Sequence, residues 1–208
     1  MRRALIHSHR ADTPFRHWLL RDALPATLWP PLLALPFAPP AIGDTRGKRE
    51  THNGSRLFVT EETRAHLPAC NALAEALQDE ATVALIGDLT GTDLRGCFLR
   101  IECCLDTDGF WLEPHTDIGA KRFTMLIYLS TDPEAEEWGT DLLDGAGTLV
   151  GRASGAFNTG LVFIPGADTW HGFAKRPIQG VRRSLIVNYV GPEWRSRQEL
   201  AYPGQAVA

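Results

Sequence analysis

The hydrophobic pattern of the chain changes near residue 96. Beyond that point, short runs rich in Val, Ile, Phe and Leu are separated by Gly, Pro, Asp and Asn, which is typical of strands and turns. We expect strands at residues 97–105, 110–114, 123–129, 148–151, 159–164, 169–173 and 183–190. So many short strands at close spacing predict a double-sheet jelly roll, the double-stranded β-helix of cupin-like proteins, whose mouth is a natural ligand pocket.

The first half of the chain is expected to be mainly helical. Thr60 followed by Glu61 is a helix start, and Pro68 is expected to make the helix restart. The apolar residues of this stretch recur on one helical face: Leu67, Cys70, Ala74 and Leu77. A second helix is expected over residues 83–89. Residues 14–23 predict a short strand, followed by a proline-rich turn and a helix.

The length of 208 residues favours one domain with one core. We divide it into helical support at about 1–95, a jelly-roll core at about 96–190 and a tail at 191–208. The expected fold class is therefore mainly β with flanking helices (α+β).

Composition narrows the function classes. The net charge of −4 does not indicate the excess of basic residues that nucleic-acid binding requires, so no nucleic-acid partner is expected. The apolar stretch at residues 24–37 is broken by prolines and is too short to cross a membrane. Charged residues interrupt any apolar segment near the N-terminus, so we expect no secretory signal peptide. The protein is therefore expected in the cytoplasm, and no oligomeric state is predicted.

The four cysteines form no CxxC and no zinc pattern. Cys103 and Cys104 are adjacent, so on a strand they would point to opposite faces. Buried, reduced thiols are therefore the expected state.

The main candidate for chemistry is a set of three side chains. A single residue separates His115 from Asp117, and His171 follows in the strand-rich region downstream. Two imidazoles and one carboxylate can occupy three facial positions of octahedral Fe(II), which leaves three positions for a bidentate cosubstrate and dioxygen. A His-x-Asp triplet alone is a weak signal, because chance produces it often in a chain with 7 histidines. The prediction of an iron site therefore depends on the triplet together with the residues that follow it downstream.

A basic pair opens the last predicted strand, after His171. An arginine binds a carboxylate in a two-point fork, so Arg182 can hold the far end of a dicarboxylic acid whose near end chelates the iron. Neighbouring residues of a strand point to opposite faces, so only one of Arg182 and Arg183 can enter the pocket. We choose Arg182 from its Gly-x-Arg-x-Ser context. The triad and the arginine together imply 2-oxoglutarate.

Several motifs occur in an order known from one superfamily: Glu113-Pro114-His115-Thr116-Asp117, Met125-Leu126-Ile127-Tyr128-Leu129, Gly139-Thr140, Phe163-Ile164-Pro165-Gly166, His171 and Gly180-Val181-Arg182. With them the chain resembles the Fe(II)/2-oxoglutarate-dependent dioxygenases, particularly the prolyl-4-hydroxylase-like branch. The resemblance covers about residues 96–190, roughly the C-terminal half.

The resemblance implies roles for named residues. His115, Asp117 and His171 would ligate iron, and Arg182, assisted by Ser184 on the same strand face, would bind the distal carboxylate of 2-oxoglutarate. Relatives usually carry a tyrosine on the strand before the metal loop, which this chain lacks. Tyr128 is our candidate for its hydrogen bond to the cosubstrate.

The implied activity is hydroxylation of a small molecule, an amino acid or a peptidyl side chain with dioxygen, releasing succinate and CO2. Halogenating relatives lack the carboxylate ligand, so Asp117 argues against that reaction. Two alternatives stay open: a non-catalytic cupin-type sensor that binds metal or a dicarboxylate, and a cupin oxygenase that needs no oxoacid. The polar loop at residues 43–55 is expected to carry solvated charges, with a substrate-facing lid as the alternative.

Overall fold

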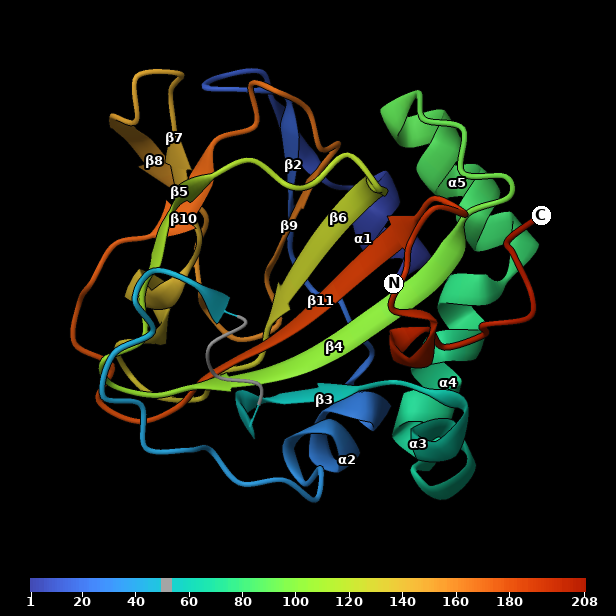
Figure 1. The fold of residues 1–208 in the computed structure, drawn as a ribbon, viewed down its shortest axis with the longest axis horizontal. Helices are drawn as coiled ribbons and strands as arrows, with labels where there is room; N and C mark the ends of the chain where they lie inside the picture. Colours follow the sequence, from blue (N-terminus) through green and yellow to red (C-terminus); the bar gives the residue numbers. More distant parts are fainter. Residues whose placement is uncertain (50–53) are drawn as a thin grey trace.

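Two antiparallel sheets form the frame of the protein (Figure 1). The computed structural model describes residues 1–49 and 54–208. The larger sheet contains seven strands in the order β1 (His9–Ala11), β2 (His17–Leu20), β9 (Gly160–Phe163), β6 (Lys121–Tyr128), β11 (Arg182–Val190), β4 (Phe98–Asp106) and β3 (Arg56–Phe58). The smaller sheet contains β5 (Leu112–His115), β10 (His171–Phe173), β7 (Asp141–Leu143) and β8 (Leu149–Arg152). This architecture confirms the predicted jelly roll.

Each strand predicted between residues 97 and 190 has a counterpart whose ends lie within two residues of the predicted ends. The sequence did not predict β7, whose three residues are too few for a periodic signal. Residues 1–95 add to the frame as well as supporting it, because β1, β2 and β3 all belong to the larger sheet. These strands are also only three or four residues long.

The helices are α1 (Arg2–Ile6), α2 (Trp29–Leu33), α3 (Glu61–His66), α4 (Pro68–Gln78) and α5 (Glu80–Thr90), with short 3-10 turns η1 (Ala26–Leu28), η3 (Ala135–Trp138) and η4 (Arg197–Glu199). Thr60 caps α3 by accepting a hydrogen bond from the backbone of Thr63, and Pro68 opens α4, so the predicted start and restart are confirmed. Gly91 ends α5 in a left-handed conformation at φ 76°, which a glycine adopts without strain.

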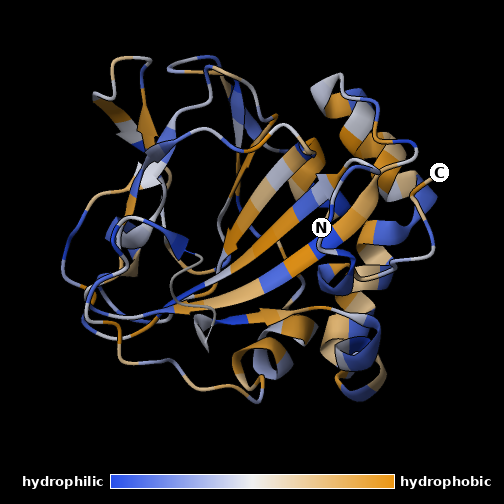
Figure 2. Ribbon diagram, viewed as in Figure 1, coloured by the Kyte–Doolittle hydropathy of each residue, from blue (hydrophilic) through white to orange (hydrophobic). Residues whose placement is uncertain are grey.

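The larger sheet has an apolar outer face and an inner face on which apolar and polar side chains are mixed. Leu99, Ile101 and Cys103 of β4 belong to the main core, which also contains the buried apolar residues of α4 and α5. The intervening side chains of β4, among them Glu102 and Cys104, lie on the other face. Bands of hydrophilic and hydrophobic residues alternate along part of this strand (Figure 2). The predicted separation of Cys103 from Cys104 is confirmed, and all four cysteines are buried and free.

The tail after β11 packs along the beginning of β4. The backbone N–H of Ala201 donates to the carbonyl of Leu99 at 2.9 Å, and that of Val207 donates to the carbonyl of Cys97 at 2.8 Å. Across the described residues, we find no helix with the length and apolar character that a membrane span requires.

Candidate metal centre and its cavity

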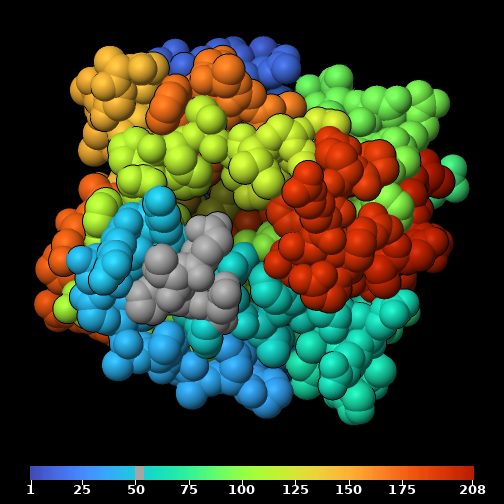
Figure 3. Space-filling view, viewed as in Figure 1, coloured from blue at the N-terminus to red at the C-terminus, as the bar shows by residue number. Residues whose placement is uncertain are grey.

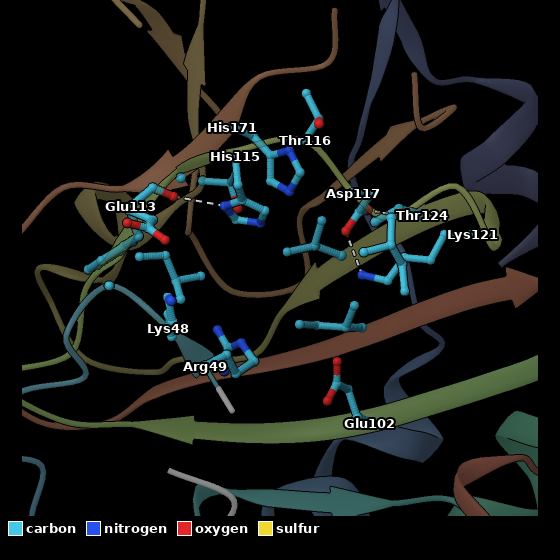
Figure 4. A pocket seen from close by; sticks show the side chains of 18 of the residues that line it. Lys48, Arg49, Glu102, Glu113, His115, Thr116, Asp117, Lys121, Thr124 and His171 are labelled. Carbon is cyan, nitrogen blue, oxygen red and sulfur yellow. Dashed lines mark hydrogen bonds and ion pairs between the residues drawn. The ribbon is translucent and has the colours of Figure 1, made fainter. Parts of the chain in front are cut away.

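Strand pairing brings two histidines together. His115, the last residue of β5, lies opposite His171, the first residue of β10, and their ring centroids are 4.3 Å apart. Asp117 stands on the turn between β5 and β6. The nearest candidate ligand atoms of the three side chains all lie within 4.8 Å of one another (Figure 4). The three predicted metal ligands therefore converge, although 56 positions separate the first and last of them in the sequence.

Backbone carbonyls fix the orientation of both rings. Nδ1 of His115 lies 2.8 Å from the carbonyl oxygen of Glu113, and Nδ1 of His171 lies 2.9 Å from that of Thr169. A carbonyl only accepts, so Nδ1 carries the proton in each ring and Nε2 keeps its lone pair for a metal. Burial, reinforced by the positive charge of neighbouring groups, lowers the pKa of His171 to about 4. The ring is therefore neutral at pH 7, as a ligand must be.

Asp117 is held as a carboxylate by two residues of β6. Lys121 Nζ lies 2.5 Å from Oδ1, and the hydroxyl of Thr124 donates to Oδ2 at 2.8 Å. Burial alone would raise the pKa of Asp117, but the charge of Lys121 and these hydrogen bonds lower it to about 2. Lys121 follows Asp117 by four residues, and this spacing was the available signal of the ion pair in the sequence.

The three ligands border a cavity of about 340 Å³ between the sheets. Its opening is the hollow in Figure 3, between the light-blue segment before residue 50, the yellow-green stretch of β5 and β6, and the red C-terminal tail. Two imidazoles and one carboxylate on a single wall, with open space beside them, are the donor set and geometry that suit Fe(II) with free coordination positions.

Arg182 lines the same cavity and is only 2% exposed. Its Nε donates to the carbonyl of Trp138 and its Nη1 to Oδ2 of Asp106, both at 2.6 Å. Arg183 is not among the residues of the cavity wall; its backbone N–H donates to Ser130. The alternation of β11 therefore separates the two arginines as expected.

Ser184 has a buried hydroxyl with no hydrogen-bond partner among the described residues. It lies between Arg182 and Ile186 on β11, and both of these line the cavity. The alternation of the strand puts Ser184 on the same inner face. A buried hydroxyl without a partner is costly. Ser184 itself is not among the residues that line the cavity.

Tyr128 has its hydroxyl engaged by one residue. The hydroxyl donates to Oγ1 of Thr140 at 2.7 Å and accepts the backbone N–H of Thr140 at 3.1 Å. Thr140 lines the cavity, whereas Tyr128 is not among the lining residues. In this arrangement Tyr128 fixes Thr140, and Thr140 is the member of the pair that can touch a ligand.

Sequence reasoning missed a group of buried charges on the cavity wall. Glu102, on the inner face of β4, is paired with Arg56 at 2.5 Å and with Arg100 at 3.0 Å. Burial alone would raise the pKa of Glu102, but these arginines lower it to about 2. No motif marks such residues, because the pairing depends on neighbouring strands rather than on spacing in the sequence.

The loop at residues 43–55 contributes Arg49 to this wall. The expectation of solvated charges is wrong for Arg49, which is 9% exposed and binds Asp106 through both terminal nitrogens, at 2.9 and 3.3 Å. The backbone N–H of Glu113 donates to the carbonyl of Gly47 at 3.0 Å, which ties the segment to β5. Residues 50–53 of the predicted loop lie outside the described residues.

No protein-family model matches the chain, and no curated protein matches it significantly. Several solved structures are similar to it. An oxidoreductase of the 2OG-Fe(II) oxygenase family from Burkholderia pseudomallei is 20% identical with a TM-score of 0.57, covering 84% of each chain. A Pseudomonas putida prolyl-4-hydroxylase is 15% identical with a TM-score of 0.55, covering 91% of this chain and 96% of the other.

A third similar structure is a prolyl hydroxylase from Trichoplax adhaerens, in complex with a peptide fragment of hypoxia inducible factor. It is 14% identical with a TM-score of 0.57, covering 84% of this chain and 83% of the other. At these identities the likeness shows the fold. The chain therefore has the jelly-roll fold of solved 2-oxoglutarate/Fe(II) oxygenases, with a His-Asp-His cluster at its cavity.

Proposed function

We propose that the protein is an Fe(II)- and 2-oxoglutarate-dependent oxygenase that hydroxylates a small molecule, an amino acid or a peptidyl side chain. The observation that carries the proposal is the convergence of His115, Asp117 and His171 within 4.8 Å at the wall of a cavity that also contains Arg182. The fold shared with solved oxygenases supports it.

Each residue has a defined task in this proposal. His115, Asp117 and His171 would hold the ferrous ion, and Arg182 with Ser184 would bind the distal carboxylate of 2-oxoglutarate. Tyr128 would act through Thr140, which it positions. The ion, when bound, would supply dioxygen activation: one oxygen atom would enter succinate as 2-oxoglutarate loses CO2, and the other would enter a C–H bond of the substrate.

The test has two stages. The first is an anaerobic titration with Fe(II) and then 2-oxoglutarate, followed by the visible metal-to-ligand charge-transfer absorption. The second is a screen of metabolites and peptides for oxygen-dependent succinate release. Absence of the absorption band at saturating iron and cosubstrate would contradict the proposal.

The same experiment decides between the alternatives. A sensor would bind metal or dicarboxylate without oxygen-dependent succinate formation, and an oxygenase of the oxoacid-independent type would turn over without 2-oxoglutarate. The pairing of an arginine with a metal triad in one cavity favours the oxoacid-dependent reaction over both.

A further inference from the structure

One buried carboxylate joins two arginines on the cavity wall. Asp106, at the end of β4, is 0% exposed. Its Oδ1 accepts Nη1 of Arg49 at 2.9 Å, and its Oδ2 accepts Nη1 of Arg182 at 2.6 Å. Arg49 comes from the segment before residue 50 and Arg182 from β11, so Asp106 fixes two guanidinium groups from distant parts of the chain side by side.

Aromatic rings restrict both guanidinium groups further. The ring centroid of Phe110 lies 4.7 Å from Cζ of Arg49 and 5.6 Å from Cζ of Arg182. The ring centroid of Phe173, a residue of the smaller sheet, lies 4.7 Å from Cζ of Arg182. This packing holds the two arginines in place before any ligand arrives, which lowers the entropy cost of binding.

The charge of the cluster decides what it can bind. Arg182 and Asp106 alone form a neutral pair, which attracts an anion weakly. Arg49 adds a second guanidinium, so the three side chains together carry one net positive charge. Burial strengthens the attraction of that charge for a carboxylate, since screening by water is reduced.

The charged neighbours are paired with one another. Arg176 and Arg152 share Asp141, and Arg152 also contacts Glu137. Arg56 and Arg100 share Glu102, and Arg100 also binds Glu199. Each of these two groups therefore balances its own charge.

Both arginines keep unused donors. Arg49 uses Nη1 and Nη2 for Asp106, and Arg182 uses Nε and Nη1. Among the described residues, Nε of Arg49 and Nη2 of Arg182 thus donate to no protein oxygen, although both side chains line the cavity. A carboxylate has two oxygens and can accept from both.

We propose that Arg49 is a second cosubstrate-binding residue and that the cluster of Arg49, Asp106 and Arg182 binds the distal carboxylate of a dicarboxylic 2-oxoacid. The inference rests on the proposed function and extends it. Asp106 acts as a positioning residue that orients both arginines and sets their net charge. The cluster selects a diacid over a monoacid, because only a diacid brings the second carboxylate.

The test compares 2-oxoglutarate with 2-oxopentanoate, which has the same carbon chain without the distal carboxylate. Each acid is titrated anaerobically into the Fe(II)-loaded protein, and the charge-transfer absorption gives its affinity without turnover. Arg49→Met should weaken 2-oxoglutarate about tenfold or more and leave 2-oxopentanoate unchanged. Arg46→Met, an exposed arginine in the same segment, is the matched control and should change neither.

A charge-compensated variant separates this role from a structural one. Arg49→Met combined with Asp106→Asn removes one charge of each sign and restores the net positive charge at Arg182. The amide oxygen at position 106 can still accept the hydrogen bond from Nη1 of Arg182 and keep it oriented, so this variant should recover most of the lost affinity for 2-oxoglutarate.

Three outcomes would overturn the inference while leaving the proposed function intact. Arg49→Met could bind 2-oxoglutarate as tightly as the parent does, or it could lose affinity for both acids equally. The third outcome is that adding Asp106→Asn to Arg49→Met recovers no affinity for 2-oxoglutarate. Absence of 2-oxoglutarate binding in the parent protein would overturn the proposed function and the inference together.

Discussion

His115 and His171 occupy directly opposed positions on the antiparallel strands β5 and β10. In each strand the ring donates Nδ1–H to the carbonyl two residues earlier, at Glu113 and at Thr169. The same local arrangement thus orients both rings, and the ladder between the strands sets their separation. A site on paired strands holds its ligands more rigidly than a site on loops.

Replacing any one of the three ligands should abolish oxygen-dependent succinate formation. His115→Ala, Asp117→Ala and His171→Ala would each remove one of the proposed metal ligands, so iron binding measured by anaerobic equilibrium dialysis should fall with activity. His66→Ala is the matched control, because that exposed ring lies on α3 outside the cavity wall. Retained succinate production in all three variants would refute the triad.

The hydroxyl of Thr124 should contribute to metal affinity. It donates to Oδ2 of Asp117 at 2.8 Å and accepts Nδ2 of Asn188 at 2.9 Å, so it orients the carboxylate from behind. Thr124→Val keeps the shape and removes the hydroxyl. We expect metal affinity to fall about 10–100-fold in a competition titration with a chelator.

Thr124→Ser is the control for this prediction, since it retains the hydroxyl and should stay near the parent affinity. Equal loss in the valine and serine variants would point to packing rather than to the hydrogen bond.

Arg182→Ala should raise the concentration of 2-oxoglutarate required for half-maximal signal by a factor of tens, because removing one partner of a buried charge pair costs about 2–5 kcal/mol. Iron binding should change little, since no ligand is removed. Arg183→Ala, one residue along β11 and outside the cavity wall, is the matched control. A cosubstrate dependence that changes in Arg183→Ala instead would move the role to that residue.

The sequence was sufficient to predict most strands of the jelly roll and the convergence of His115, Asp117 and His171, for a physical reason. Strands of nine residues such as β4 and β11 carry enough alternation to be recognised, and only one residue separates His115 from Asp117. His171 could be added because it follows in a strand-rich region and the fold closes on itself.

The carboxylate at Asp106 shows what the sequence could not supply. Its partners Arg49 and Arg182 lie 57 and 76 positions away, and no periodicity relates them. Their pairing follows from the register of β11 on β4, in which Arg182 faces Asp106. The short strands β1, β3 and β7 were missed for a related reason, because three residues form a strand only when a neighbouring strand supplies the hydrogen bonds.

Glu102 should make the stability of the protein depend on acid pH. The arginines beside it outweigh burial and lower its pKa from the ordinary value of 4.5 to about 2. A carboxyl group whose pKa is lower in the folded state contributes stability above its unfolded pKa and loses that contribution as the pH falls towards the folded pKa. The contribution of Glu102 is therefore complete above about pH 4.5 and disappears towards about pH 2.

Glu102→Gln tests this dependence, because it leaves Arg56 and Arg100 without their shared carboxylate. Breaking a buried ion pair in this way costs about 3–5 kcal/mol, so urea unfolding near neutral pH should show a loss of that order. The difference between the parent and the variant should narrow as the pH falls below about 4.5. Glu61→Gln, on the exposed first turn of α3, should show no such difference. A gap that stays constant down to the lowest pH would mean that the amide disturbs packing, and that the charge of Glu102 does not stabilise the inner face of β4.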